Sequence, residues 1–181
     1  MDTVFEELYE KYHHDVFQFL FYMVKNRETA EDLVQEVYIR VLKSYSKFQG
    51  NSSEKTWLFS IARNVAIDWF RKQKNWKQRL IDKFDWTEQQ IKDNQPFPEE
   101  ITLQKEEVRL IMNSLNKCTF DQRVVVIMRY FNELSISETA GALNWTESKV
   151  KTTQHRALKA LKGNLQELIK ATKSANQNTH Q

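Results

Sequence analysis

The chain has 181 residues, enough for one large domain or two small ones, and only three glycines and two prolines interrupt it. Its 40% hydrophobic content, with five tryptophans and eleven phenylalanines, favours compact helical cores. The formal net charge of +3 is too small to indicate nucleic-acid binding by itself, so the distribution of charge matters more than the total.

The cysteine count and the lack of long apolar runs disfavour several kinds of site and location. The single cysteine, Cys118, excludes an internal disulfide and a cysteine-based zinc site, and we expect it to be a small buried residue. No apolar run reaches the ~18 residues that span a bilayer, and the N-terminal residues lack the basic-then-apolar order of a signal peptide. We therefore expect a cytoplasmic protein.

Three amphipathic helices are predicted in the first half of the chain. Apolar residues recur at helical spacing from Phe5 to Met23 and again from Ala30 to Tyr45, with Leu42 in the second stripe. The break at residues 26–27 separates the two helices, and Thr29 is a candidate N-cap for the second. After a polar turn at residues 48–53, capped by Ser52 or Ser53, a third helix is expected over residues 54–74. Its predicted inward residues are Trp57, Leu58, Ile61, Ala62, Val65 and Trp69.

The third helix becomes basic and aromatic toward its end. Between residues 63 and 79 there are six cationic residues and one carboxylate, Asp68, with Trp69, Phe70 and Trp76 among them. Cations follow a phosphate backbone and aromatic rings stack on unpaired bases, which is the composition of a single-strand-binding surface. Lysines and arginines whose aliphatic stems cover core tryptophans would give the same composition.

Residues 82–107 are acidic, with eight carboxylates against three lysines, and the sequence Asn-Gln-Pro-Phe-Pro at 94–98 cannot continue a helix. We interpret this stretch as a linker between two domains. The predicted fold is all-α, with two small helical domains joined by an acidic flexible linker. The expected boundaries are 1–79 for the first domain, 80–107 for the linker, 108–170 for the second domain and 171–181 for a disordered tail.

The second domain has the pattern of a helix-turn-helix. Helices are expected near residues 108–115 and 121–131, followed by a short helix with small residues at 140–142 and a turn at 144–146. Val150, Ala157, Leu158 and Leu161 then form one apolar face of a second helix. The polar and cationic residues between them would face the major groove of DNA.

Three motifs in order resemble those of bacterial sigma-70 factors. Residues 29–40, with the sequence TAEDLVQEVYIR, resemble region 2.2; residues 48–53 and 56–68 resemble regions 2.3 and 2.4; residues 134–160 are similar to region 4.2. The arrangement of two domains joined by an acidic linker resembles that of the extracytoplasmic-function group. Within this group the chain is most similar to the sigma X type of the bacilli. The resemblance covers roughly residues 1–165 and is carried by three separate motifs.

The resemblance implies a function as the RNA polymerase subunit that selects promoters. The expected partners are core polymerase (through its β′ clamp helices and β flap), promoter DNA and an anti-sigma factor, often membrane-embedded, with no cofactor and no small-molecule substrate. The implied contacts with core polymerase are Asp32, Gln35, Glu36 and Arg40. Those with the −10 element, which would be melted with one base flipped out, are Arg63, Asn64, Asp68, Trp69, Arg71 and Lys72. Those with the −35 element are Ser148, Lys149, Lys151, Thr152, His155 and Arg156.

The residues leave two other functions open as alternatives. A stand-alone helix-turn-helix regulator would need a dimer interface, and no coiled-coil seam is left over for one. A metal-dependent hydrolase could be built on His13, His14 and Asp15, but the other histidines lie in the second domain and the pair falls on the polar side of a helix. We therefore expect no catalytic site in this chain.

Overall fold

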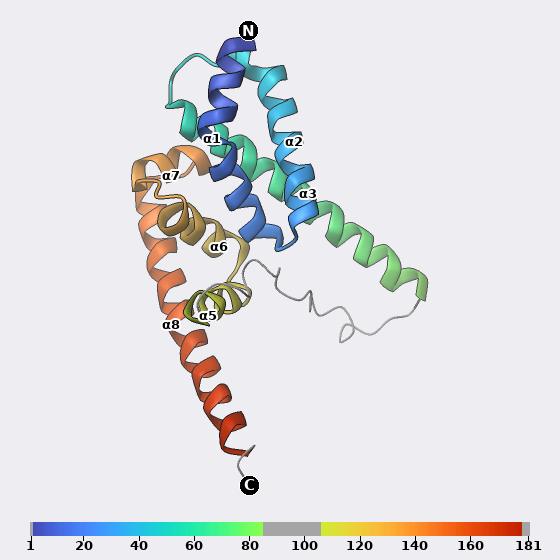
Figure 1. Cartoon of the computed structure of the whole chain (residues 1–181), viewed down its shortest axis with the longest axis vertical. Helices are drawn as coiled ribbons and strands as arrows, with labels where there is room; N and C mark the ends of the chain where they lie inside the picture. Colours follow the sequence, from blue (N-terminus) through green and yellow to red (C-terminus); the bar gives the residue numbers. More distant parts are fainter. Residues whose placement is uncertain (1, 85–105, 179–181) are drawn as a thin grey trace. The chain divides into compact units, whose positions relative to one another are not determined.

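A computed structural model describes residues 2–84 and 106–178 (Figure 1). Every regular element in these residues is helical, and no strand occurs among them. The chain divides into two compact units, residues 1–97 and 98–181. The prediction of an all-α chain with two helical domains is therefore confirmed.

The first unit is a bundle of three long helices that pack against one another in pairs: α1 (Asp2–Val24), α2 (Arg27–Ser44) and α3 (Glu54–Phe84). A short 3₁₀ turn, η1 (Tyr45–Lys47), follows α2. The core contains the predicted apolar stripes, with the fully buried side chains Val16, Phe19, Leu20, Met23, Val37, Leu58 and Phe59. Phe59 and Ala66, which were not among the predicted inward residues of α3, are both fully buried.

The N-terminus of α2 differs from the prediction. Helix α1 ends at Val24, Lys25 adopts a left-handed conformation (φ 56°), and Asn26 caps α2. The side-chain oxygen of Asn26 accepts a hydrogen bond from the backbone N–H of Thr29 at 2.8 Å. Thr29 is therefore not the cap but the third residue of the helix. The apolar stripe resumes only at Ala30, so the polar first turn of α2 carries no periodic signal.

The second unit packs three short helices against one long one. Helices α5 (Glu106–Leu115), α6 (Phe120–Val126) and α7 (Ile136–Leu143) all contact α8 (Glu147–Asn178), and a π-helical turn, η3 (Ile127–Phe131), continues α6. The β-branched run at 124–127 is thus a buried helix, as predicted. The core of the second unit contains the buried residues Met112, Leu115, Val124, Val125, Ile127, Met128, Leu134, Leu143, Val150 and Ala157.

The helices extend further than the predicted boundaries. Helix α3 reaches Phe84 and α5 begins at Glu106, so residues 80–84 and 106–107, assigned to the linker, are helical. The remainder of the predicted linker lies outside the described residues. Helix α8 continues to Asn178, which corrects the prediction of a disordered tail from residue 171. No proline follows Gly163, and this glycine lies within α8 rather than at its C-cap, so nothing local ends the helix there.

Candidate nucleic-acid and protein interfaces

The exposed side of α2 forms the first candidate interface, here called the α2 face: Asp32, Gln35, Glu36, Ile39, Arg40 and Leu42. Asp32 and Gln35 are exposed, whereas Glu36 and Arg40 are half-buried. The sequence pattern placed Leu42 in the buried stripe, but its side chain is 54% exposed, and Ile39 is 44% exposed. The α2 face therefore combines carboxylates with apolar side chains, a mixture suited to binding another protein.

The second candidate interface is the α3 face, made of Asn64, Asp68, Arg71 and Lys72. Asn64, Asp68 and Arg71 are spaced by four and three residues, which places them in one stripe along the helix. Asn64, Arg71 and Lys72 are exposed. Arg63 and Trp69 lie to either side of this stripe and are half-buried, with Trp69 packed edge-to-face on Phe70 at 4.8 Å. Arg63 donates from its Nη1 to Asn64 Oδ1 at 3.4 Å, so it contacts the stripe, whereas Trp69 lies on the other side of it.

An ion-pair network connects the α2 face and the α3 face. The Nε of Arg40 donates to Glu36 Oε1 at 2.8 Å, and its Nη1 lies 3.0 Å from Asp68 Oδ2. The other oxygen of Asp68 is 3.7 Å from Nη1 of Arg71. The hydrogen bond to Glu36 is the main cause that raises the pKa of Arg40 above its ordinary value. Sequence reasoning assigned Arg40 and Asp68 to different partners and did not predict that they contact each other.

Aromatic packing fixes both ends of the loop between η1 and α3. Phe48 stacks on Trp57 with ring centroids 4.8 Å apart, and Tyr45 meets the same indole edge-on at 5.9 Å. Ser53 caps α3 by accepting a hydrogen bond from the backbone N–H of Thr56 at 3.1 Å, which decides between the two predicted caps. The loop between these anchors is exposed from Gln49 to Ser53.

In the second unit, α7 and α8 form the predicted helix-turn-helix. Ser135 and Glu138 make a capping box at the start of α7, which satisfies two backbone donors of its first turn. Asn144 ends α7 in a left-handed conformation (φ 54°), which asparagine adopts more readily than most residues. The hydroxyl oxygen of Thr146 then accepts a hydrogen bond from the backbone N–H of Lys149 at 3.2 Å, at the start of α8.

The third candidate interface is the α8 stripe, the outward side of the first three turns of α8. All of its predicted residues are exposed: Ser148, Lys149, Lys151, Thr152, His155 and Arg156. Val150 and Ala157 are fully buried, as the pattern of polar and apolar positions predicts, whereas Leu158 of the same predicted face is exposed. The ammonium of Lys149 lies over the Trp145 ring, 3.9 Å from its centroid.

Arg129 of η3 links α8 to the segment that precedes α7. Its Nε donates to the side-chain oxygen of Gln154 at 2.9 Å, and its Nη1 donates to the carbonyl of Leu134, just before α7. One guanidinium thus contacts both the recognition helix and the segment that enters the helix-turn-helix. Arginine suits this role because its planar fork donates in two directions.

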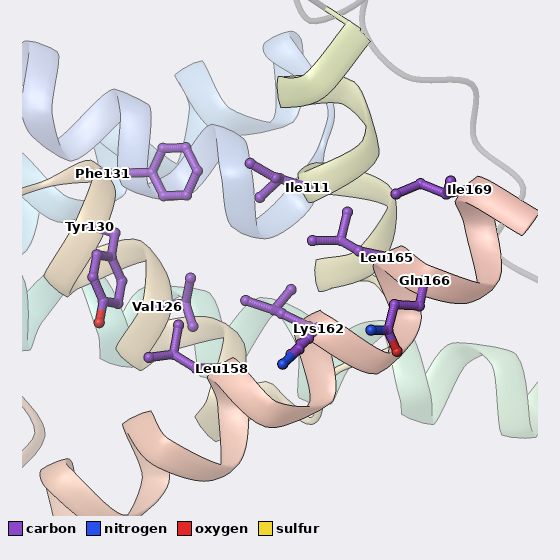
Figure 2. A pocket seen from close by; sticks show the side chains of 10 residues that line it. Ile111, Val126, Tyr130, Phe131, Leu158, Lys162, Leu165, Gln166 and Ile169 are labelled. Carbon is purple, nitrogen blue, oxygen red and sulfur yellow. The ribbon is translucent and has the colours of Figure 1, made fainter.

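An apolar groove lies alongside α8 from Leu158 toward Ile169 (Figure 2). It has a volume of about 480 Å³, and Figure 2 shows Leu158 and Leu165 of α8 facing it together with Ile111 of α5 and Phe131 of η3. Leu158, predicted as part of the buried face, is instead 41% exposed here, and Tyr130 is 50% exposed. Sequence reasoning did not predict the groove, because the spacing of an apolar residue does not distinguish a core from an open groove.

His13 of α1 and Cys118 are the residues whose chemistry would suit a metal site or a nucleophile. His13 is exposed and stacks on Tyr9 at 4.9 Å, as expected for a helix surface. Within residues 2–84 and 106–178, no cluster of three or more metal-ligating side chains occurs. Cys118 is buried, and burial raises the pKa of its thiol, which disfavours the reactive thiolate. Over the same ranges, no helix is long and apolar enough to cross a membrane.

Comparison with known families gives two matches that follow the division into units. Residues 8–75 match the Sigma-70 region 2 family, and residues 108–161 match the family described as Sigma-70, region 4. The first match contains the α2 and α3 faces, and the second contains the α8 stripe. The described structure resembles the sigma factor RpoE of Bartonella quintana, solved with the anti-sigma factor NepR, with a TM-score of 0.70 and 22% identity over 90% of this chain and 96% of that one.

Two curated relatives come from Bacillus subtilis (strain 168). The extracytoplasmic-function (ECF) RNA polymerase sigma factor SigX is 57% identical over 166 residues, which cover 92% of this chain and 86% of that protein. The RNA polymerase sigma factor YlaC is 34% identical over 88% of this chain and 91% of its own length. The agreement of both domains, their order and their fold shows that the chain belongs to the extracytoplasmic-function group of RNA polymerase sigma factors.

Proposed function

We propose that this chain divides promoter recognition among the surfaces described above, as the specificity subunit of RNA polymerase with no catalytic site of its own. The α2 face and the apolar groove bind core polymerase, the α3 face captures the melted −10 element, and the α8 stripe reads the −35 duplex. The protein acts in the cytoplasm, where polymerase works.

The α2 face supports binding to the β′ clamp helices. Asp32 and Gln35 are exposed for polar contacts, with Glu36 and Arg40 beside them, and Ile39 and Leu42 supply apolar area that binding would cover. Protein interfaces gain most of their affinity from a few desolvated side chains, so Leu42 adds to the contacts inferred from sequence. The groove along α8 has the apolar lining that accepts one face of a helix and is the proposed site for the β flap.

The α3 face supports capture of single-stranded −10 DNA. Asn64 carries both a donor and an acceptor, so it can read the edge of an unpaired base held against the exposed loop at Gln49–Ser53. Flipping a base out of the duplex costs a few kcal/mol, which a pocket and aromatic stacking offset. Arg63 and Trp69 flank the stripe, and Arg71 and Lys72 contribute cations that attract the separated strand.

Two observations support the α8 stripe as the −35 reader: the family match covers residues 108–161, and the side chains of the stripe are exposed. The predicted contacts Ser148, Lys149, Lys151, Thr152, His155 and Arg156 are all exposed on one helix, above a buried seam that fixes its rotation. Such a helix presents its N-terminal half to base edges in the major groove. Arginine and lysine donate to guanine, and each good bidentate pair contributes ~1–3 kcal/mol of discrimination.

Run-off transcription with purified core polymerase tests this assignment. We expect promoter-specific transcripts only when the chain is present, and a loss of ~1–3 kcal/mol in promoter binding for Arg156→Ala, a large effect for one side chain. On a promoter with a scrambled −35 element, Arg156→Ala should cause no further loss. Asn64→Ala should reduce transcription whether or not the −35 element is present. Glu10→Ala and Lys170→Ala, which alter exposed residues outside the proposed surfaces, serve as controls.

Two results would overturn the proposal. If the chain bound duplex DNA as a dimer and did not redirect core polymerase, a helix-turn-helix regulator would be the better description. If Arg156→Ala lost equal activity on the intact and scrambled promoters, α8 would not read the −35 element.

The variant Leu158→Glu tests the groove. It should lower affinity for core polymerase without changing the preference among −35 sequences.

We further propose an anti-sigma factor as a regulatory partner. One structural relative, the sigma factor RpoE, was solved as such a complex with the anti-sigma factor NepR. The exposed apolar side chains Ile39, Leu42 and Tyr130 are surfaces that a protein inhibitor could cover. Co-purification with the chain, followed by loss of run-off transcription on adding the partner, would identify it.

A further inference from the structure

The α3 face contains one residue whose charge is unfavourable for DNA. Asp68 lies in the same stripe as Asn64 and Arg71, and its side chain is 36% exposed. Phosphate groups repel a nearby carboxylate. An unpaired carboxylate therefore weakens DNA binding to a basic surface unless a cation neutralises its charge. The neutralising group comes from a different helix.

Arg40 of α2 supplies that group. Its guanidinium lies between two carboxylates, 2.8 Å from Glu36 on its own helix and 3.0 Å from Asp68 on α3. Arg71, the cation of α3 that faces Asp68, is 3.7 Å away and 69% exposed. Arg40 is therefore the closer partner of Asp68, and Arg71 keeps donors available for DNA.

We propose that Arg40 and Asp68 are positioning residues for promoter opening: Arg40 neutralises Asp68 and so keeps the α3 face both oriented toward α2 and attractive to the melted strand. This inference rests on the proposed function of α3. In this proposal the main role of Arg40 is to pair with Asp68 and not to contact polymerase. The main role of Asp68 is likewise to pair with Arg40 and not to contact DNA. Removing Arg40 would leave Asp68 with the more distant Arg71 and would take the 2.8 Å partner from Glu36. Removing the charges of Arg40 and Asp68 together would take the carboxylate off the α3 face.

The test compares Arg40→Met, Asp68→Asn and the double variant in complete holoenzyme. Open-complex formation is followed by the fluorescence of 2-aminopurine in the −10 element, and affinity for core polymerase is titrated separately. We expect Arg40→Met to slow opening about threefold to fivefold, in keeping with the upper range for exposed ion pairs. Asp68→Asn alone should change little. At saturating core polymerase, the double variant should open promoters at a rate within about twofold of wild type.

The salt dependence separates repulsion from loss of structure. If Asp68 repels the strand in Arg40→Met, the defect should shrink as salt rises, because screening weakens interactions between exposed charges. A purely structural defect would not follow ionic strength in this way. Arg27→Met is the matched control, since it breaks the 3.0 Å ion pair with Glu31 on the same helix. Circular dichroism confirms that each variant is folded.

Specific results would overturn this inference. A loss of core affinity in Arg40→Met that Asp68→Asn does not rescue would make Arg40 a direct polymerase contact. A defect in Asp68→Asn as large as that of the double variant would make Asp68 a direct DNA contact. In both cases wild-type holoenzyme still opens promoters, so the proposed function stands. If the wild-type chain opens no promoter, the proposed function itself fails.

Discussion

At the scale of single residues, the structure separates side chains that have the same sequence signal. Leu42 and Val41 are neighbours in the predicted apolar stripe, but Val41 is 1% exposed and Leu42 is 54% exposed. Leu158 and Leu161 differ in the same way, since only Leu161 is buried. Periodicity places a residue within about one position of a helix face, and the neighbouring helices decide whether that position is covered.

Tyr38 is a buried residue whose polar atom has no partner among the described residues. Its side chain is 4% exposed and packs against Tyr9 at 4.8 Å and Phe5 at 5.8 Å, but its hydroxyl makes no hydrogen bond there. Burial is the main cause that raises the pKa of Tyr38 above its ordinary value. The neutral phenol is therefore favoured in the folded chain.

We expect Tyr38→Phe to keep or increase the free energy of unfolding, by about 1 kcal/mol at most, because it removes a buried hydroxyl without a partner. The raised pKa adds a pH dependence. The contribution of Tyr38 to stability is complete below about pH 10 and is lost above it, as the unfolded chain ionises first. Urea denaturation at pH 7 and pH 10.5 measures both effects.

Tyr130→Phe, at a 50% exposed site, is the control and should change stability by less than about 0.5 kcal/mol. A large loss of stability in Tyr38→Phe at pH 7 would mean that the hydroxyl has a partner after all.

At the scale of elements, helix type and order followed from sequence, but helix ends did not. Amphipathic spacing predicted α1, α2, α3 and α8, whose apolar residues form long regular stripes. The N-terminus of α2 was misplaced because Asn26 and Thr29 are both good capping residues, and the first helical turn, Arg27–Thr29, contains no apolar residue. The C-terminus of α8 lies beyond the predicted one, because the polar composition after residue 171 predicts disorder although no proline or C-cap signal ends the helix.

The two candidate caps of α2 can be compared directly. Asn26→Ala should cost ~1 kcal/mol of stability, because the backbone N–H of Thr29 loses the acceptor 2.8 Å away. Thr29→Ala, three residues into α2, should cost less than ~0.5 kcal/mol. Guanidinium denaturation of the two variants gives the comparison, and a larger loss for Thr29→Ala would contradict the observed cap.

At the scale of the whole molecule, the division into two units was predictable from composition. The acidic, proline-containing stretch separates two segments that each contain enough apolar residues for a core. The exposure of the α8 stripe was also predictable: all six of its residues are exposed, and their contacts with DNA stay a prediction. The Arg40–Asp68 pair and the groove were not, because both depend on which helices pack together, and no local pattern records that.

We expect the two units to fold independently, because each buries its own apolar residues between its own helices. Residues 1–97 and 98–181, expressed separately, should each be helical and unfold cooperatively. Their far-UV circular dichroism should sum to that of the whole chain within error. A half that is unfolded on its own, but folds when the other is added, would show that the units stabilise each other.

The continuity of α8 has a consequence for how this protein can change in length. The α8 stripe and the wall of the groove are parts of one uninterrupted helix, from Glu147 to Asn178. Each residue of an α-helix adds a rotation of about 100°, so inserting one residue near Lys159 would turn Leu161 and Leu165 away from α5 and α6. Inserting seven would restore their direction but move them along the axis by about 10 Å. A one-residue insertion or deletion between the α8 stripe and Leu165 would therefore change the direction of the groove wall relative to the stripe, whereas a substitution leaves their relative direction unchanged.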